Sequence, residues 1–389
     1  MNTVGIVAEF DPFHNGHKYL IDKAKEHGDA VVCVVSGSFV QRAAPALLPA
    51  RVRSLAALLN GADAVLRLPF VYAVSSAELF AASAVKILCG FGCNKICFGA
   101  ETPDREKILK AAEFFNSEKY LQRLKKGLEK DEVFPVARQK ALAEEGIDLD
   151  ISHPNNILAV EYTKEVLKSF PEVDIIPVGR TVFNHNSTLT ENGFASGSYI
   201  RELMRMGKGF SDFIPENVCE LYSDCLRDGS FADFSKFSTA VLSKLRLGEG
   251  EKLFANLNTE LHARLKNSVG SARDLDELYF LMKAKHYTHS RIRRAVLSEY
   301  FEITDDDLKI NPPYIGLPGF VKRNEDKIRE LVRGASLPVI TSYSEIKKLE
   351  SKDADRVFEL EQKSTDIYSL CLSTPEKCGL EYTQGIIKI

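Results

Sequence analysis

The chain has 389 residues, a formal net charge of −3, 44% hydrophobic residues and 27% charged residues. This length accommodates one domain with a large core and at least one further domain. No apolar run approaches the roughly 20 residues of a membrane-spanning helix, and residues 1–7 lack the features of a secretory signal. We therefore expect a cytoplasmic globular protein without a membrane partner. The negative charge excludes a uniformly basic coat, so contacts with nucleic acid must come from local patches.

Predicted strands and helices alternate through the first half of the chain. Short apolar, β-branched runs predict strands at 3–8, 30–35, 64–68, 95–98 and 173–178. Helical spacing predicts helices at 16–25, 51–60, 75–88, 155–170 and 196–204. We expect Ser75 and Glu78 to form a capping box for the third helix, and Asn155 or Asn156 to cap the fourth. The alternation favours a Rossmann-like α/β fold with a parallel sheet, in which ligands bind beyond the carboxyl ends of the strands.

This pattern is interrupted once and then changes. Residues 104–146 are highly charged and carry few strand signals, which predicts a helical insertion. From residue 209 onward only helices with charged faces are evident. We therefore expect a first domain at 1–208 and a mainly helical second domain at 209–389. The Pro-containing sequences at 311–314 and 317–320 are predicted to be turns that connect helices of the second domain.

Eight cysteines are present, and in a cytosolic protein they indicate buried thiols more than disulfides. Cys89, Cys93 and Cys97 are evenly spaced but are expected on a helix end, a Gly-rich turn and a strand. No CxxC pair or nearby histidine completes a ligand set. The run therefore does not favour a metal or redox centre.

The sequence EFDPFHNGH, from Glu9 to His17, lies between the first predicted strand and the first predicted helix and contains an HxGH motif. An α-phosphate under attack gains negative charge, which two imidazoles and the N–H groups of a helix N-terminus can stabilise. His14 and His17 are therefore the predicted catalytic residues. Gly16 lets adenine or ribose approach the backbone, while Pro12 and Phe13 shape the loop.

Further motifs follow in order: SGSFVQR at 36–42, NGAD at 60–63, LPF at 68–70, SAELFA at 76–81, FGAE at 98–101 and SHPNNILAVEY at 152–162. With EFDPFHNGH, they resemble the tRNA(Met) cytidine acetate ligase family of the HxGH nucleotidyltransferase superfamily. The resemblance implies an ATP-dependent enzyme that makes acetyladenylate from acetate. It further implies acetylation of the wobble cytidine of elongator tRNA(Met) to N4-acetylcytidine.

The resemblance also implies the residues of the ATP site. A continuous segment would wrap the nucleotide: Val7, Ala8, Glu9, Phe10, Asp11, Pro12, Phe13, His14, Asn15, Gly16, His17, Lys18, Tyr19 and Leu20. Gly99, Asn155 or Asn156, and Arg180 would complete it. A late ASGSYIR sequence adds Ser196 and Ser198, whose hydroxyls can hold phosphates at a helix start, and Arg201 one turn further. Gly197 and Tyr199 replace the Ser or Thr of related motifs, which leaves the contacting hydroxyl open.

Acetate is already ionised, so its activation needs positioning and charge neutralisation more than a strong base. Ser36, Ser38, Gln41 and Arg42 follow the second strand and are predicted to line the acyl pocket or meet the tRNA end. Mg²⁺ is expected on the phosphates, but the sequence identifies no ligands for it.

A basic run with one aromatic residue is the predicted tRNA contact, because it offers phosphate contacts and stacking. Its members are Lys283, Lys285, His286, Tyr287, Arg291, Arg293 and Arg294. The lysines between residues 119 and 130 are a weaker candidate, because glutamates alternate with them.

Three other functions are weighed against this hypothesis. A small-molecule adenylyltransferase or cytidylyltransferase would share HxGH, but it would not need the long second half with its basic run. A class I aminoacyl-tRNA synthetase would need a KMSKS-like loop, and none is found. A catalytically silent RNA- or nucleotide-binding module has no physical reason to keep His14, Gly16 and His17.

Overall fold

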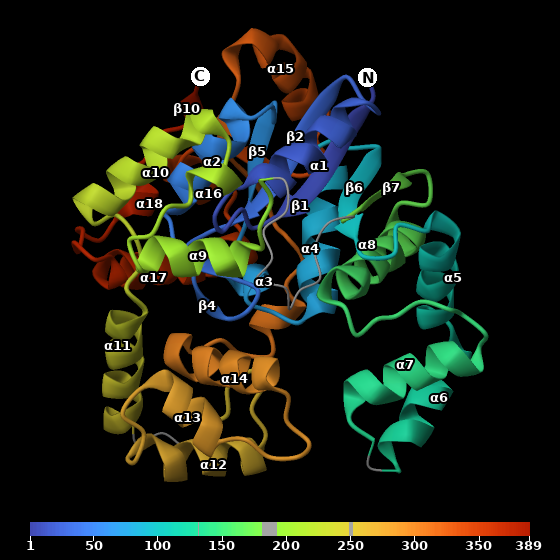
Figure 1. The fold of residues 1–389 in the computed structure, drawn as a ribbon, viewed down its shortest axis with the longest axis vertical. Coiled ribbons are helices and arrows are strands. Elements are labelled where there is room, and N and C mark those ends of the chain that lie inside the picture. Colours follow the sequence, from blue (N-terminus) through green and yellow to red (C-terminus); the bar gives the residue numbers. More distant parts are fainter. Residues whose placement is uncertain (131, 181–192, 249–251) are drawn as a thin grey trace.

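The computed structural model describes residues 1–130, 132–180, 193–248 and 252–389. Within these ranges, eight strands form one sheet in the order β10-β8-β5-β2-β1-β6-β7, with β9 paired to β8 (Figure 1). A small hairpin joins the other two strands. The strands are β1 (Thr3–Ala8), β2 (Ala30–Ser36), β3 (Phe39–Val40), β4 (Ala44–Pro45), β5 (Ala64–Leu68), β6 (Lys95–Ala100), β7 (Asp174–Gly179), β8 (Ile315–Phe320), β9 (Val339–Ile340) and β10 (Ile387–Lys388).

The five strands from the first half, β5-β2-β1-β6-β7, are parallel, which confirms the predicted α/β fold. Their residues are apolar almost throughout because helices cover both faces of the sheet. In β2, Val31 and Cys33 belong to one buried cluster, while Val32 and Val34 belong to the other. Successive side chains of a strand point to opposite faces, so one short run builds both cores.

Helices flank both faces of the sheet. One core includes residues of α1, α2, α9 and α10, and the other includes residues of α3, α4, α5 and α8. The helices are α1 (Asn15–Lys25), α2 (Ala50–Leu59), α3 (Phe70–Ala73), α4 (Ala77–Gly90), α5 (Arg105–Phe115), α6 (Glu118–Leu128), α7 (Phe134–Glu144), α8 (Pro154–Ser169), α9 (Gly197–Arg205), α10 (Glu216–Asp228), α11 (Phe234–Leu247), α12 (Thr259–Val269), α13 (Leu275–Leu281), α14 (His289–Phe301), α15 (Glu325–Gly334), α16 (Tyr343–Lys347), α17 (Lys352–Cys371) and α18 (Leu380–Thr383).

Two predicted helix starts are wrong. The N-cap of α4 is Ser76, whose hydroxyl accepts from the Leu79 N–H, while Ser75 donates to the Val71 carbonyl at the end of α3. The predicted capping box of Ser75 and Glu78 therefore does not form. Helix α8 begins after His153 without a side-chain cap. Asn155 and Asn156 lie inside its first turn and form other contacts.

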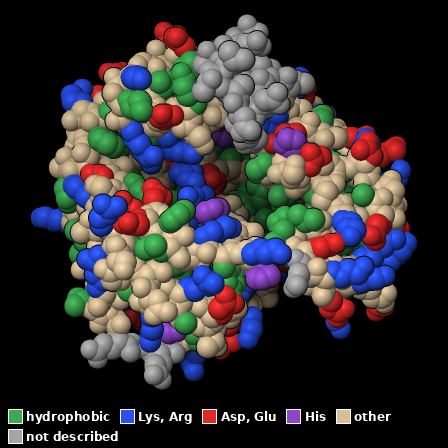
Figure 2. Space-filling view, turned by 60° about the horizontal axis from the view of Figure 1, so that its bottom comes forward, with side chains coloured by type: hydrophobic (Ala, Val, Ile, Leu, Met, Phe, Trp, Pro, Cys, Tyr) green, Lys and Arg blue, Asp and Glu red, His purple; other side chains and the backbone are tan. Residues whose placement is uncertain are grey.

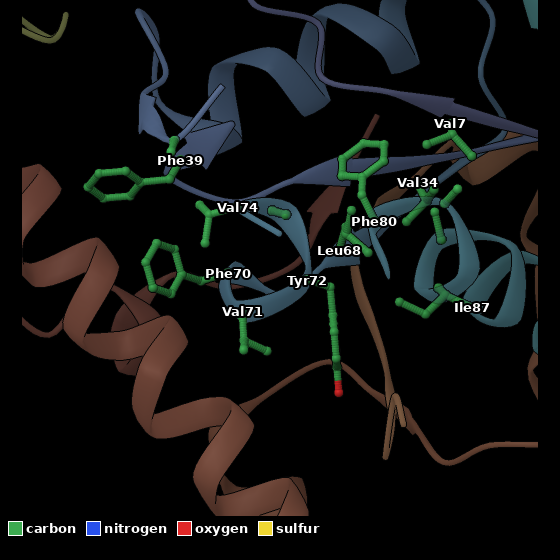
Figure 3. Packing of buried hydrophobic residues seen from close by; sticks show 14 of the residues in the cluster. Val7, Val34, Phe39, Leu68, Phe70, Val71, Tyr72, Val74, Phe80 and Ile87 are labelled. Atoms are coloured by element: carbon green, nitrogen blue, oxygen red, sulfur yellow. The ribbon is translucent and has the colours of Figure 1, made fainter. Parts of the chain in front are cut away.

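The helical insertion is confirmed as α5, α6 and α7, which extend from the sheet on one side of the molecule (Figure 1). On the other side, α11 to α14 form a second helical lobe below the sheet. Figure 3 shows Phe39 and Phe70 facing one another, and the Phe70 ring lies 4.7 Å from that of Phe301 in α14. Aromatic packing of this kind ties the lobe to the sheet.

The second half of the chain is mainly helical, but it also completes the sheet. Residues 317–320, predicted to be a turn, form part of β8, which is antiparallel to β5. β9 and β10 pair with β8, and α17 lies against α3. The expectation of connector turns failed because β8 contains Pro318 and two glycines, which are rare in central strands. None of the helices in the described ranges combines the length and apolar character needed to cross a bilayer.

Candidate active site

A cavity of about 530 Å³ lies at the carboxyl ends of β1, β6 and β7. Figure 2 shows it as a central hollow with apolar walls and with Lys, Arg and His side chains near its rim. Its position beyond the strand ends is where an α/β sheet binds ligands. Its lining includes Val7, Ala8, Glu9, Phe10, Asp11, His14, Gly16, His17, Tyr19, Leu20, Gln41, Phe80, Phe98, Gly99, Asn155, Leu158, Tyr162, Arg180, Ser196, Ser198 and Arg201.

His14 and His17 lie together at the N-terminus of α1. Their rings are stacked, with centroids 3.7 Å apart. Nδ1 of His14 accepts from the Gly16 N–H at 3.1 Å, and Nδ1 of His17 accepts from the His14 N–H at 3.3 Å. The two side chains therefore cap the helix reciprocally, while both also line the cavity. Capping and a place in the cavity coexist, so the cap does not explain the motif away.

Both imidazoles are neutral at pH 7. Burial, aided by the Arg180 and Arg201 guanidiniums, lowers the pKa of His14 to about 3. Burial, His14 and Arg180 hold the pKa of His17 well below its usual range. Because each Nδ1 accepts a backbone N–H, the remaining proton of each ring resides on Nε2. Two Nε2–H donors are thereby available to an anionic ligand.

The loop before α1 is held from several directions. The Phe13 N–H donates to the Tyr222 hydroxyl of α10, and Phe13 itself is fully buried. A β-carbon on Gly16 would lie 2.9 Å from Cε1 of His14, so glycine makes room for the stacked ring. Phe10 has a φ of 49°, in the left-handed region. These contacts preorganise the two histidines.

The structure distinguishes Asn155 from Asn156. Asn155 lines the cavity, where its Oδ1 accepts from Nη1 of Arg180 at 3.2 Å. Asn156 is fully buried outside the lining, and its side chain holds the Thr102 N–H and the Asp150 carbonyl. Glu101 accepts from both asparagines. Asn155 and Arg180 are therefore the pair presented to a ligand.

On the opposite wall, α9 contributes two serines and an arginine to the lining. Ser196 is the N-cap of α9 and accepts from the Tyr199 N–H at 3.2 Å. The Ser198 hydroxyl accepts from Nη2 of Arg201 at 2.9 Å, and Nη1 of Arg201 donates to the Asp11 carbonyl at 2.6 Å. Of the two serines, Ser198 therefore lies next to the cation.

Three of the four residues predicted for the acyl pocket or the tRNA end lie outside the cavity. Ser36 is buried beside Arg53, and Ser38 lies 3.1 Å from the Thr365 hydroxyl. Arg42 pairs with the Asp11 carboxylate. Gln41, at the tip of the β3-β4 hairpin, does line the cavity.

A charged network that the sequence did not reveal lies beneath this wall. Asp11 is buried, and its carboxylate accepts from Arg42 and from the Leu47 N–H. Arg201 approaches the same carboxylate at 3.7 Å. Arg53 is fully buried and donates to the carbonyls of Leu48 and Ser36 and also to those of Glu9 and Gly37. These cations hold the loop that leads into the HxGH motif.

Other residues of the predicted nucleotide segment lie elsewhere. Asn15 donates to the Gly193 and Asp212 carbonyls, and Lys18 is exposed and pairs with Asp22. Pro12 and Phe13 support the loop without lining the cavity. The lining instead includes Phe80, Phe98, Leu158 and Tyr162. Their only sequence signal was apolar periodicity, which also describes a core.

The basic run is divided by the structure. Lys283, Lys285 and His286 are exposed. Tyr287, expected to stack on a base, is buried, and its hydroxyl contacts Asn258 and Glu260. The α14 arginines are half-buried: Arg291 and Arg293 lie over the rings of Tyr287 and Tyr279, while burial lowers the pKa of Arg294.

The cysteines follow the prediction of buried thiols, all free. Cys89 lies in α4, Cys93 in the following turn and Cys97 in β6. Burial raises the pKa of Cys89 and of Cys97 to about 12. Across the described ranges, no group of three or more His, Cys, Asp or Glu side chains is arranged to hold a metal ion.

Comparisons with known proteins agree with this site. Residues 1–381 match the HIGH Nucleotidyl Transferase family. A tRNA(Met) cytidine acetate ligase of Clostridium tetani is 31% identical over 393 residues, covering 95% of this chain and 96% of the relative. One from Thermoanaerobacter sp. is 32% identical over 403 residues and covers 100% of both chains.

Solved structures add the same likeness in three dimensions. A crystal structure of Thermotoga maritima TmcAL bound with alpha-thio ATP has a TM-score of 0.91 and 27% identity, and the apo form has a TM-score of 0.93 and 28% identity. Both cover 100% of each chain. The chain therefore belongs to the HIGH nucleotidyl transferase family and, within it, to the tRNA(Met) cytidine acetate ligases.

Proposed function

We propose that this chain activates acetate with ATP and transfers the acetyl group to the wobble cytidine of elongator tRNA(Met). The observation that carries the proposal is the convergence of two imidazole Nε2–H donors, Arg180 and Arg201 on one cavity. Four donors around one space fit a triphosphate. The ATP analogue in the Thermotoga maritima structure and the names of the relatives support the same conclusion.

In the first step, a carboxylate oxygen of acetate attacks the α-phosphorus and pyrophosphate leaves. His14 and His17 donate to oxygens that gain charge in the transition state. The triphosphate would raise the pKa of both rings, since a nearby anion favours the imidazolium. Ser198 and Arg201, at the N-terminus of α9, would hold the leaving pyrophosphate.

Mg²⁺ commonly accompanies ATP, but the residues at this site do not form a cage for it. The Asp11 carboxylate is committed to Arg42 and the Leu47 N–H, and no metal-binding group is found in the described residues. We propose that Mg²⁺ enters on the phosphates of ATP and not on protein carboxylates.

Pyrophosphate release tests this function. We expect release from ATP to require acetate and to proceed without tRNA, and we expect acetate, ATP and tRNA together to yield N4-acetylcytidine in digested nucleosides. A small-molecule adenylyltransferase or cytidylyltransferase would release pyrophosphate from ATP or CTP without acetate. Acid-independent release, or tRNA that stays unmodified, would contradict the proposal.

Exposed lysines of the basic run are proposed to contact tRNA phosphates. Replacing Lys283 and Lys285 with alanine should weaken tRNA binding and make the salt dependence of log Kd less steep by up to about two. Acetate-dependent pyrophosphate release should be unchanged. Matched alanine replacements of Lys23 and Lys327, near the opposite edge of the sheet, are the control. Equal tRNA binding by both double variants would place the tRNA elsewhere, with the lysines of α6 as the next candidate.

A further inference from the structure

The cavity has two unlike halves, which lie on opposite faces of the sheet. His14 and His17 at α1 and Ser198 and Arg201 at α9 belong to one side. Phe80 of α4, Phe98 of β6, and Leu158 and Tyr162 of α8 belong to the other, and these four lie in or against the core cluster of that face. The second half is apolar and aromatic, so it suits a flat, uncharged group better than a phosphate.

Glu9 stands at the end of β1, between the two halves. It lines the cavity, its backbone carbonyl accepts from Arg53, and its Oε1 accepts from the Gln41 N–H. Oε2 accepts no hydrogen bond from any residue in the described ranges. The carboxylate is thus held at one oxygen and available at the other, beside the aromatic wall.

We propose that Glu9 is a catalytic residue of the acetyl-transfer step, with Oε2 accepting the N4 proton of a cytosine bound against the aromatic wall. This inference rests on the proposed function and deepens it. Cytosine presents an N4 amine, for which a carboxylate is the matching acceptor. An unstacked base of a single-stranded loop is commonly held against aromatic side chains.

The step balances as follows. The N4 lone pair forms a bond to the carbonyl carbon of acetyladenylate, and the bond from that carbon to the phosphate oxygen breaks. AMP leaves with the electron pair, and the N4 proton passes to Oε2 of Glu9, from which water later removes it. The products are N4-acetylcytidine and AMP. No oxidant, reductant or further reactant is required.

The surroundings of Glu9 agree with this role. Burial, the dominant cause, raises the pKa of Glu9, and Asp11 adds to it, while Arg42, Arg53 and the Gln41 N–H oppose it. Tyr162 also faces Glu9, and burial with the Glu9 charge raises the pKa of its phenol, which stays protonated. A raised carboxylate pKa brings the base closer to the working pH.

Glu9→Gln tests the proposal because glutamine can keep the hydrogen bond to the Gln41 N–H but cannot take the proton. With synthetic acetyladenylate and tRNA, the variant should transfer acetyl at least about 100-fold more slowly than wild type. Its acetate-dependent pyrophosphate release in the absence of tRNA should stay within about twofold. Glu26→Gln, at the far end of α1, is the matched control for both assays.

The pH profile separates catalysis from structural support. Wild-type transfer from acetyladenylate should fall as the pH drops through the Glu9 pKa, because the protonated acid cannot accept a proton. The residual rate of Glu9→Gln should lack that inflection. Equal loss of pyrophosphate release would assign Glu9 to the nucleotide and overturn the inference, as would unimpaired transfer. If wild type itself fails to transfer from acetyladenylate, the proposed function fails instead.

Discussion

Replacing His17 with alanine is expected to lower acetate-dependent pyrophosphate release by about 100- to 1,000-fold, the usual cost of removing one transition-state donor. The ring supplies one of the two Nε2–H donors in the cavity and stacks on His14 at 3.7 Å. Its loss also removes the acceptor for the His14 N–H. Pyrophosphate release at saturating ATP, measured beside ATP binding, separates the loss of rate from the loss of affinity.

Two comparisons guard this result against misfolding. His17 packs near Phe10 and Phe13, with ring centroids 5.0 and 5.7 Å away, so its removal costs some stability and thermal unfolding must be followed. His17→Asn retains a polar side chain and should show the same catalytic loss. His27→Ala, at the exposed turn after α1, should behave as wild type. Normal turnover by both His17 variants would remove the basis of the catalytic assignment.

Asp11→Asn is expected to lower the free energy of unfolding by about 3 kcal/mol, the lower range for breaking a buried ion pair. The amide can keep the Leu47 N–H bond but cannot neutralise Arg42 or Arg201, which would then face one another across an uncharged group. Equilibrium denaturation measures the change. Asp22→Asn removes the exposed Lys18–Asp22 pair and should change stability by less than about 0.5 kcal/mol.

The same variant has a defined pH dependence. Burial alone would raise the pKa of Asp11, but Arg42, Arg201 and Arg53 together hold it below its usual value of 3.8. A carboxylate with a lowered pKa stabilises the fold above its unfolded pKa and loses that contribution as the pH falls through the folded one. The stability difference between wild type and variant should therefore be full at pH 6 and narrow below pH 4. A difference that stays constant down to pH 3 would show that charge is not its origin.

Residues that are adjacent in sequence can have opposite roles, as α8 illustrates. Asn155 and Asn156 were indistinguishable in the sequence, and successive helical residues point about 100° apart. One therefore reaches the cavity beside Arg180, while the other is buried against Thr102 and Asp150. Tyr287 shows the same limit, because its place in a basic run says nothing of the partners that bury its hydroxyl.

The sequence alone determined the parallel sheet, the helical insertion and the histidine pair before α1. Apolar periodicity, helix caps and the HxGH spacing act over a few neighbouring residues, so they can be read locally. Tertiary structure alone decided that β8 to β10 complete the sheet, that Arg42, Arg53 and Arg201 converge beneath Glu9 and Asp11, and that apolar side chains from α4 and α8 form a cavity wall. The free energy of burying a charge or an aromatic ring depends on groups that lie far away in the chain, and only the folded protein brings them together.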